Sequence, residues 1–209
     1  MGKVYYSEGK NEQATISLNE ALKLAPGSAP ALLTLARIGI ETAQTPDQLQ
    51  AAADKIQTAL KTEPQSSDGW YDLGKIAIRQ NRPKDAIEHL KKALAASPMH
   101  NGALHQIERA LRADGRTAEA DRTKKVLEER LLREREELRL EEYIEHHPKD
   151  WDAQGKLAEI YLLSGKRGLA MLLQQRLQQN APDNAALPAL NKALGQQTAP
   201  PSSPGTKEP

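Results

Sequence analysis

The sequence predicts an all-α fold: a right-handed solenoid of antiparallel helix pairs with one long helix and a disordered C-terminal tail. Apolar and small residues recur at three- and four-residue spacings through most of the 209 residues, and this spacing places them on one stripe of a helix. Prolines that end helices recur roughly every 34 residues in most of the chain. They are Pro26, Pro64, Pro98, Pro148 and Pro182. Aromatic residues make up only 3%, without any Phe, which suits thin stacked helices better than a thick core.

Residues 66–100 show the repeating unit most completely. Its stripe consists of Trp70, Leu73, Gly74, Ala77, Ala86, Leu90 and Ala93. This spacing predicts two helices separated by a turn at residues 80–83. Pro83 can begin the second helix because a residue in the first turn needs no amide donor, and Pro98 ends it. One such pair cannot bury its apolar stripe alone, so neighbouring copies are required.

The order W-x2-L-G, then Ala, an apolar residue four positions later, another Ala and a Pro resembles the tetratricopeptide repeat, a two-helix unit of about 34 residues. The resemblance covers about residues 1–194, apart from residues 128–147, and comprises about five repeats. The fourth of these has an extended second helix. The resemblance implies a superhelix whose first helices line a concave groove, and a function in protein–protein interaction without catalysis.

The first two repeats depart slightly from this pattern. Residues 1–28 match the repeat only from the position of Gly74 onward, so the first helix lacks about two turns. We interpret this truncation as the start of a fragment rather than as a frayed helix. The second repeat, residues 29–66, is longer in its turn. There Thr45 and Gln48 are expected to form a capping box, with Pro46 at the first helical position.

Residues 117–147 contain neither Gly nor Pro and predict one long charged helix of roughly 45 Å. Because residues 133–137 are polar all round, we favour a helix that bridges through solvent. A dimerising coiled coil and a helix packed back on the solenoid are the alternatives. The predicted division is therefore an N-terminal array at 1–116, the long helix at 117–147, a C-terminal repeat with a capping helix at 148–195, and a disordered tail at 196–209. The capping helix is expected from Ala185 to Leu194.

The sequence predicts no catalytic, cofactor-binding or metal-binding residues. It has no Cys, no phosphate-binding Gly-rich loop and no H-E-x-x-H motif, and its His residues are scattered. The net charge of +1 and the scarcity of aromatics argue against nucleic-acid binding. No apolar run is long enough to span a membrane. The compartment stays open; the composition is compatible with a bacterial protein, in the cytoplasm or periplasm.

One column of the expected groove is mostly basic. The residue after the Gly74 position is Lys3, Arg37, Lys75 and Arg109 in successive repeats, and Glu159 beyond the long helix. Together with their neighbours, the predicted groove residues are Lys3, Tyr6, Arg37, Tyr71, Lys75, Arg79, His105, Arg109 and Arg112. The family's carboxylate clamp for chaperone tails is not present, because Asp68 and Asp72 stand where the clamp has basic residues.

This column predicts that the groove binds a protein or peptide partner of acidic and apolar character. The alternative is that the long basic side chains are solvated and cover helices rich in small residues. A second possible function is that of a recruiting or regulatory region in a larger enzyme or cell-envelope protein. The N-terminal end and the long helix both offer surfaces for self-association.

Overall fold

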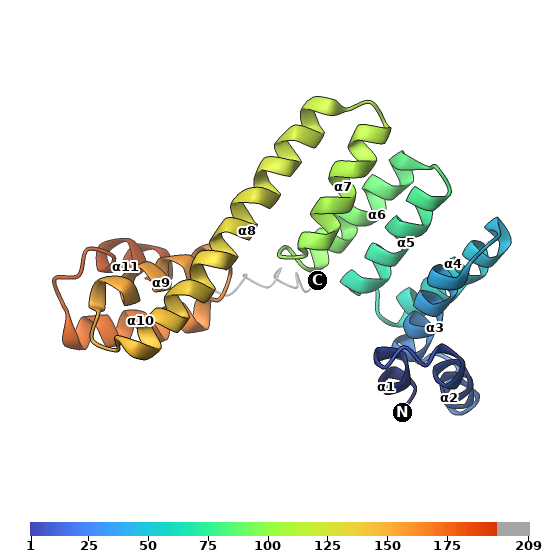
Figure 1. Ribbon diagram of the computed structural model, residues 1–209, viewed down its shortest axis with the longest axis horizontal. Helices are drawn as coiled ribbons and strands as arrows, with labels where there is room; N and C mark the ends of the chain where they lie inside the picture. Colours follow the sequence, from blue (N-terminus) through green and yellow to red (C-terminus); the bar gives the residue numbers. More distant parts are fainter. Residues whose placement is uncertain (196–209) are drawn as a thin grey trace, which may run out of the picture. The chain divides into compact units, whose positions relative to one another are not determined.

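The computed structural model describes residues 1–195, which form eleven helices and no strand (Figure 1). The helices are α1 (Gly2–Ser7), α2 (Asn11–Leu24), α3 (Ala29–Thr42), α4 (Pro46–Thr62), α5 (Ser67–Arg79), α6 (Pro83–Ala96), α7 (Asn101–Ala113), α8 (Thr117–His146), α9 (Trp151–Leu163), α10 (Arg167–Asn180) and α11 (Leu187–Gly195). The all-α fold is confirmed. The disordered tail predicted at 196–209 lies outside the described residues.

The helices form antiparallel pairs. The first helices of successive pairs pack more closely than the second helices do. The first helices contact each other, α1 with α3, α3 with α5 and α5 with α7, whereas the second helices α2, α4 and α6 make no such contacts among the described residues. The array therefore curves toward its first helices, which form its inner face. This confirms the solenoid predicted from the repeat.

The chain divides into two compact units, the first being Met1–Leu127 and the second beginning at Glu128. Helix α8 contributes to both. Its Ala120 is buried with Leu111 of the first unit, and its Leu140 is buried with Leu157 of the second. No residue between 121 and 136 is buried. The predicted four-part division, and the bridging role of the long helix, stay predictions.

Close contacts between small and large residues fix the helix pairs. In the third repeat, a Cβ added to Gly74 of α5 would lie 2.6 Å from Cγ of Leu90 on α6. The equivalent Gly2 and Leu18 show the same closeness, at 2.5 Å. A side chain larger than hydrogen would therefore push the two helices apart at these points. The Gly residues at this position are explained by packing.

The turn between paired helices has a constant backbone form in four of the repeats. Gly9, Asn81, Gly115 and Gly165 have φ angles of 74°, 55°, 77° and 72°. This left-handed conformation ends the first helix and suits Gly or Asn. The second repeat uses its longer turn instead. There the side chain of Thr45 accepts a hydrogen bond from the Gln48 amide at 3.3 Å and Gln48 accepts one from the Thr45 amide at 3.1 Å, so the capping box is confirmed.

Helix α11 covers the end of the second unit. Leu187, Leu190 and Leu194 are buried with Leu177 of α10, as expected for a helix that caps the apolar end of an array. It begins at Leu187 instead of the predicted residue 185. The reason is Asn184, whose side chain accepts a hydrogen bond from the Ala186 amide at 3.0 Å and thereby holds a turn before the helix.

Candidate functional site

All of the predicted groove residues lie on first helices of the unit formed by residues 1–127. Lys3 and Tyr6 are on α1, Arg37 on α3, Tyr71, Lys75 and Arg79 on α5, and His105, Arg109 and Arg112 on α7. These helices form the inner face of this unit; that the nine side chains line one groove stays a prediction. Their hydrogen bonds and ion pairs, however, separate them into two groups.

Arg37 is held by two carboxylates of the next first helix. Its Nε donates to Oδ2 of Asp72 at 2.8 Å and its Nη2 lies 2.8 Å from Oδ2 of Asp68. Asp72 is only 1% exposed, and burial raises its pKa more than Arg37 lowers it. Burial lowers the pKa of Arg37, but its bonds to the two carboxylates outweigh this and raise it. Arg37 therefore joins α3 to α5 and carries little free positive charge.

Tyr6 makes the equivalent connection one repeat earlier. Its hydroxyl donates to Oε1 of Glu41 at 2.6 Å. Partial burial and this carboxylate raise the pKa of Tyr6 to about 12, so the phenol stays a hydrogen-bond donor at neutral pH. The bond joins α1 to α3.

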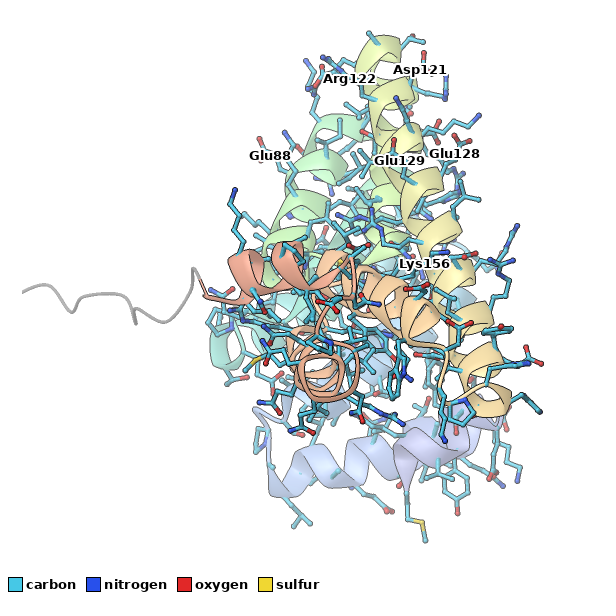
Figure 2. All side chains as sticks on the ribbon, turned by 90° about the vertical axis from the view of Figure 1, so that its left-hand side faces the viewer. Glu88, Asp121, Arg122, Glu128, Glu129 and Lys156 are labelled. Carbon is cyan, nitrogen blue, oxygen red and sulfur yellow. The ribbon has the colours of Figure 1, made fainter. Side chains whose placement is uncertain are left out.

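Arg79 and Arg112 are also engaged within the chain. Arg79 donates to the carbonyl oxygens of Ile40 and Ala43, at the C-terminal end of α3, where a cation is favoured by the helix dipole. Arg112 pairs with Glu108 and, at 2.9 Å, with Asp121. Figure 2 shows Asp121 on the first turns of α8. Both arginines hold neighbouring helices together.

Three cations of the predicted set make no ion pair within residues 1–195, namely Lys3, Lys75 and Arg109. We call them the unpaired cations. Arg109 makes only a long hydrogen bond of 3.5 Å to Gln106. Lys75 lies with its Nζ 5.8 Å from the centre of the Tyr71 ring, a geometry that supports a weak cation–π interaction.

Tyr71 itself is part of a small aromatic cluster between α5 and α7. Its ring centre lies 4.5 Å from that of His100, with the planes tilted by 37°. His105, one turn further along α7, is exposed. The structure thus brings Tyr71 and Lys75 together. Arg37, Arg79 and Arg112 are instead bound to carboxylates or carbonyl oxygens of neighbouring helices.

Sequence reasoning missed the acidic half of this surface. Asp68, Asp72 and Glu41 bind groove residues directly. The available signal was their spacing, because Asp68 and Asp72 are one turn apart and Lys75 follows Asp72 by three residues, so all three share a helix face. Which of these carboxylates reaches Arg37 depends on the rotation between repeats, which the sequence does not show.

Residues 1–195 contain neither a metal-ion cluster nor a membrane-spanning helix. No group of three or more His, Cys, Asp or Glu side chains there is arranged to hold a metal ion. Among these same residues, no helix combines the length and apolar content needed to cross a lipid bilayer.

Comparisons with known proteins agree with the helical repeat. Sequence profiles of the tetratricopeptide repeat match residues 47–99 and 137–204, and a second profile of the same description matches residues 1–28. The cytochrome c-type biogenesis protein CycH of Pseudomonas aeruginosa is 27% identical in an alignment of 123 positions that covers 52% of this chain. The chain spans only 30% of that relative's length.

Solved structures of similar fold are more distant in sequence. MamA superposes with a TM-score of 0.51 at 17% identity, covering 87% of this chain and 95% of MamA. YrrB, described as a TPR protein with an unusual peptide-binding site, superposes with a TM-score of 0.52 at 19% identity, covering 91% and 88%. At such low identity these likenesses concern the fold alone.

Proposed function

The chain belongs to the tetratricopeptide repeat family, whose members generally mediate protein–protein interaction, and we propose that it is a non-catalytic scaffold that binds a partner peptide or domain on the inner face of residues 1–127. The observation that supports this is the set of unpaired cations. Lys75 and Arg109 occupy equivalent positions on the neighbouring first helices α5 and α7, while most other cations of this face are bound to carboxylates or helix ends.

The partner segment is proposed to be acidic with an apolar component. Each exposed contact to Lys3, Lys75 or Arg109 contributes about 1 kcal/mol or less, but cations aligned along one face add their fields. The ring of Tyr71, half-buried beside Lys75, offers the apolar part. Arg37 is expected to contribute little, because Asp68 and Asp72 already neutralise it.

The test is a capture experiment with the full chain as bait and a double charge reversal, Lys75→Glu with Arg109→Glu. Arg37 is left intact, since its removal would leave Asp72 buried without a partner. The matched control is Lys61→Glu with Lys84→Glu, which reverses two exposed lysines on the second helices α4 and α6. Bound proteins are identified by mass spectrometry at low and high salt.

We expect a partner that is retained by the control, lost by the Lys75 and Arg109 variant, and weakened by salt. A partner captured equally by both variants would place the binding surface elsewhere. Circular dichroism of each variant shows whether the helices are intact, so that loss of binding can be assigned to charge.

A second candidate function is that of a recruiting region in a larger protein that serves the biogenesis of c-type cytochromes. The similarity to CycH favours it, and the relative is a longer protein than this chain. The test is deletion of the corresponding gene followed by haem staining of c-type cytochromes, with complementation by the intact gene and by the Lys75→Glu, Arg109→Glu version. Unchanged cytochromes after deletion would exclude this function.

A further inference from the structure

The second unit has a cavity beside its first helix, α9, on the side that carries Glu159 and Leu163. The cavity lies between α9 and α11 and has a volume of about 640 Å³, within the range of protein ligand pockets. Its apolar lining consists of Leu162, Leu163, Ala189, Leu190 and Ala193. Nothing in the predicted groove or in the proposed function of residues 1–127 involves these residues.

The lining leaves an apolar side chain room to enter. Leu190 is fully buried, whereas Leu163 is 64% exposed. Ala189 and Ala193, one turn apart on α11, are exposed but small. Covering this exposed leucine and the neighbouring alanines would be favourable by about 25 cal/mol for each Å² of apolar area removed from water.

The charges around the cavity favour a basic occupant. Arg167 lines the cavity, but its guanidinium donates to the carbonyl oxygens of Ala193, at 3.2 Å, and of Leu194, so its charge is taken up by the C-terminal end of α11. Glu159 also lines the cavity. It is exposed and has no ion pair within residues 1–195. Arg133 of α8 lies nearby, but its Nη1 donates to the Leu163 carbonyl oxygen at 3.0 Å, at the C-terminal end of α9. The charge left open to a partner is therefore negative.

We propose that this cavity is a second docking site, which takes an apolar side chain of a partner segment that carries Lys or Arg next to that side chain. The site is opposite in charge to the surface proposed on residues 1–127. It stands independently of that proposal, because it rests on other residues in the other unit.

The experiment uses the full chain and two fluorescent synthetic peptides. Both are amphipathic helices with the same leucines on one face; one has Lys beside the leucines and the other has Glu. Binding is measured by fluorescence anisotropy over a range of salt concentrations. We expect the Lys peptide to bind about tenfold more tightly at low salt, with a difference that shrinks as salt is added.

Two exposed leucines provide a matched pair of variants. Leu163→Asn removes the apolar side chain from the cavity without adding charge and should weaken the Lys peptide about tenfold or more. Leu172→Asn is the control, because Leu172 is 62% exposed on α10 and does not line the cavity; binding should not change. Both positions are exposed, so both variants should fold, which circular dichroism checks.

Two further variants separate charge and location. Glu159→Lys should reverse the preference, so that the Glu peptide binds more tightly. Lys61→Glu, on α4 in the other unit, should leave the binding of the Lys peptide unchanged. The proposal is overturned if neither peptide binds, if Leu172→Asn weakens binding as much as Leu163→Asn, or if Glu159→Lys leaves the preference as it was.

Discussion

The repeat α5–α6 and the repeat α9–α10 share a backbone but differ in the side chains that support it. Each first helix begins with a side-chain cap, Ser66 accepting from the Gly69 amide at 3.3 Å and Asp150 accepting from the Ala153 amide at 2.9 Å. In each, the residue four positions later donates to a proline carbonyl. Trp70 Nε1 donates to Pro64 at 2.9 Å.

Gln154 occupies the position of Trp70 and makes the same bond, its Nε2 donating to the Pro148 carbonyl at 2.8 Å. The surroundings differ, however. Trp70 stacks on His89 and lies beneath the ammonium of Lys92, whereas Gln154 is fully buried with its Oε1 unbonded among the described residues. In these two repeats the same bond is therefore supplied by a ring or by an amide, whereas Leu32 and Leu104 occupy this position in the second and fourth repeats.

The inner faces of the two repeats differ more than their backbones. Lys75 is replaced by Glu159 and Arg79 by Leu163 at equivalent positions. A change at Lys75, Glu159 or Leu163 disturbs no side-chain hydrogen bond or ion pair between helices within residues 1–195, whereas Arg79 binds carbonyl oxygens at the end of α3. Buried contacts, by contrast, should tolerate little.

Arg37→Ala should destabilise the first unit by about 3 kcal/mol at neutral pH, because it leaves the buried carboxylate of Asp72 without its partner. The measurement is urea unfolding followed by circular dichroism. Loss of Arg37 also removes the largest influence that lowers the pKa of Asp72, so this pKa rises further. A raised carboxyl pKa in the folded state means that the penalty shrinks as pH falls through that pKa.

The control for this variant is Arg109→Ala on α7, whose side chain is exposed and makes no ion pair within residues 1–195. It should change stability by no more than about 0.5 kcal/mol. Equal effects of the two variants would show that the Arg37 pairs contribute little to the fold.

Gly74→Ala should cost about 1–3 kcal/mol, because the added Cβ would lie 2.6 Å from Cγ of the fully buried Leu90. Gly168→Ala in α10 is the matched change, since a Cβ there meets nothing within 4 Å; it should gain about 0.5–1 kcal/mol from helix propensity. Urea midpoints measure both. A gain at both positions would mean that the two helices can separate at little cost.

His89 should make the stability of the first unit depend on pH. Its ring stacks on Trp70 at 5.8 Å between centroids, and its Nδ1 is buried without a hydrogen bond among the described residues. Burial and Lys92 lower the pKa of His89 more than Asp85 raises it. The unfolded chain therefore binds the proton first, and stability is lost as pH falls below about 6.5.

The second unit supplies the control for His89, because Leu173 occupies the equivalent position in α10. His89→Leu should flatten the pH dependence. Fluorescence of Trp70 in a Trp151→Phe background reports the first unit by itself. An unchanged pH profile in His89→Leu would assign the dependence to other groups.

The sequence was sufficient for what is local to one repeat. The helices, their order, the capping box at Thr45 and the turns at Asn81 and Gly165 follow from periodicity and from the preferences of single residues. The ion pairs of Arg37 could not be predicted, since they join side chains one repeat apart and depend on the rotation between repeats. The cavity beside Leu163 could not be predicted either, because it depends on where α11 begins. Asn184 holds a turn before this helix, which therefore begins later than the sequence predicts.

Asn81 and Gly165 provide the smallest predicted effect. The turn has the same bonds in both repeats, with the next amide donating over 2.8 Å to Ala77 in one and to Tyr161 in the other. Asn81 adopts φ 55° despite its Cβ, a conformation that Gly adopts without strain. Asn81→Gly should therefore gain up to about 0.5 kcal/mol, and Gly165→Asn should lose a similar amount, in urea unfolding. Opposite signs at the two positions would show that this turn is governed by backbone conformation; losses at both would mean that the Asn81 side chain stabilises its turn in another way.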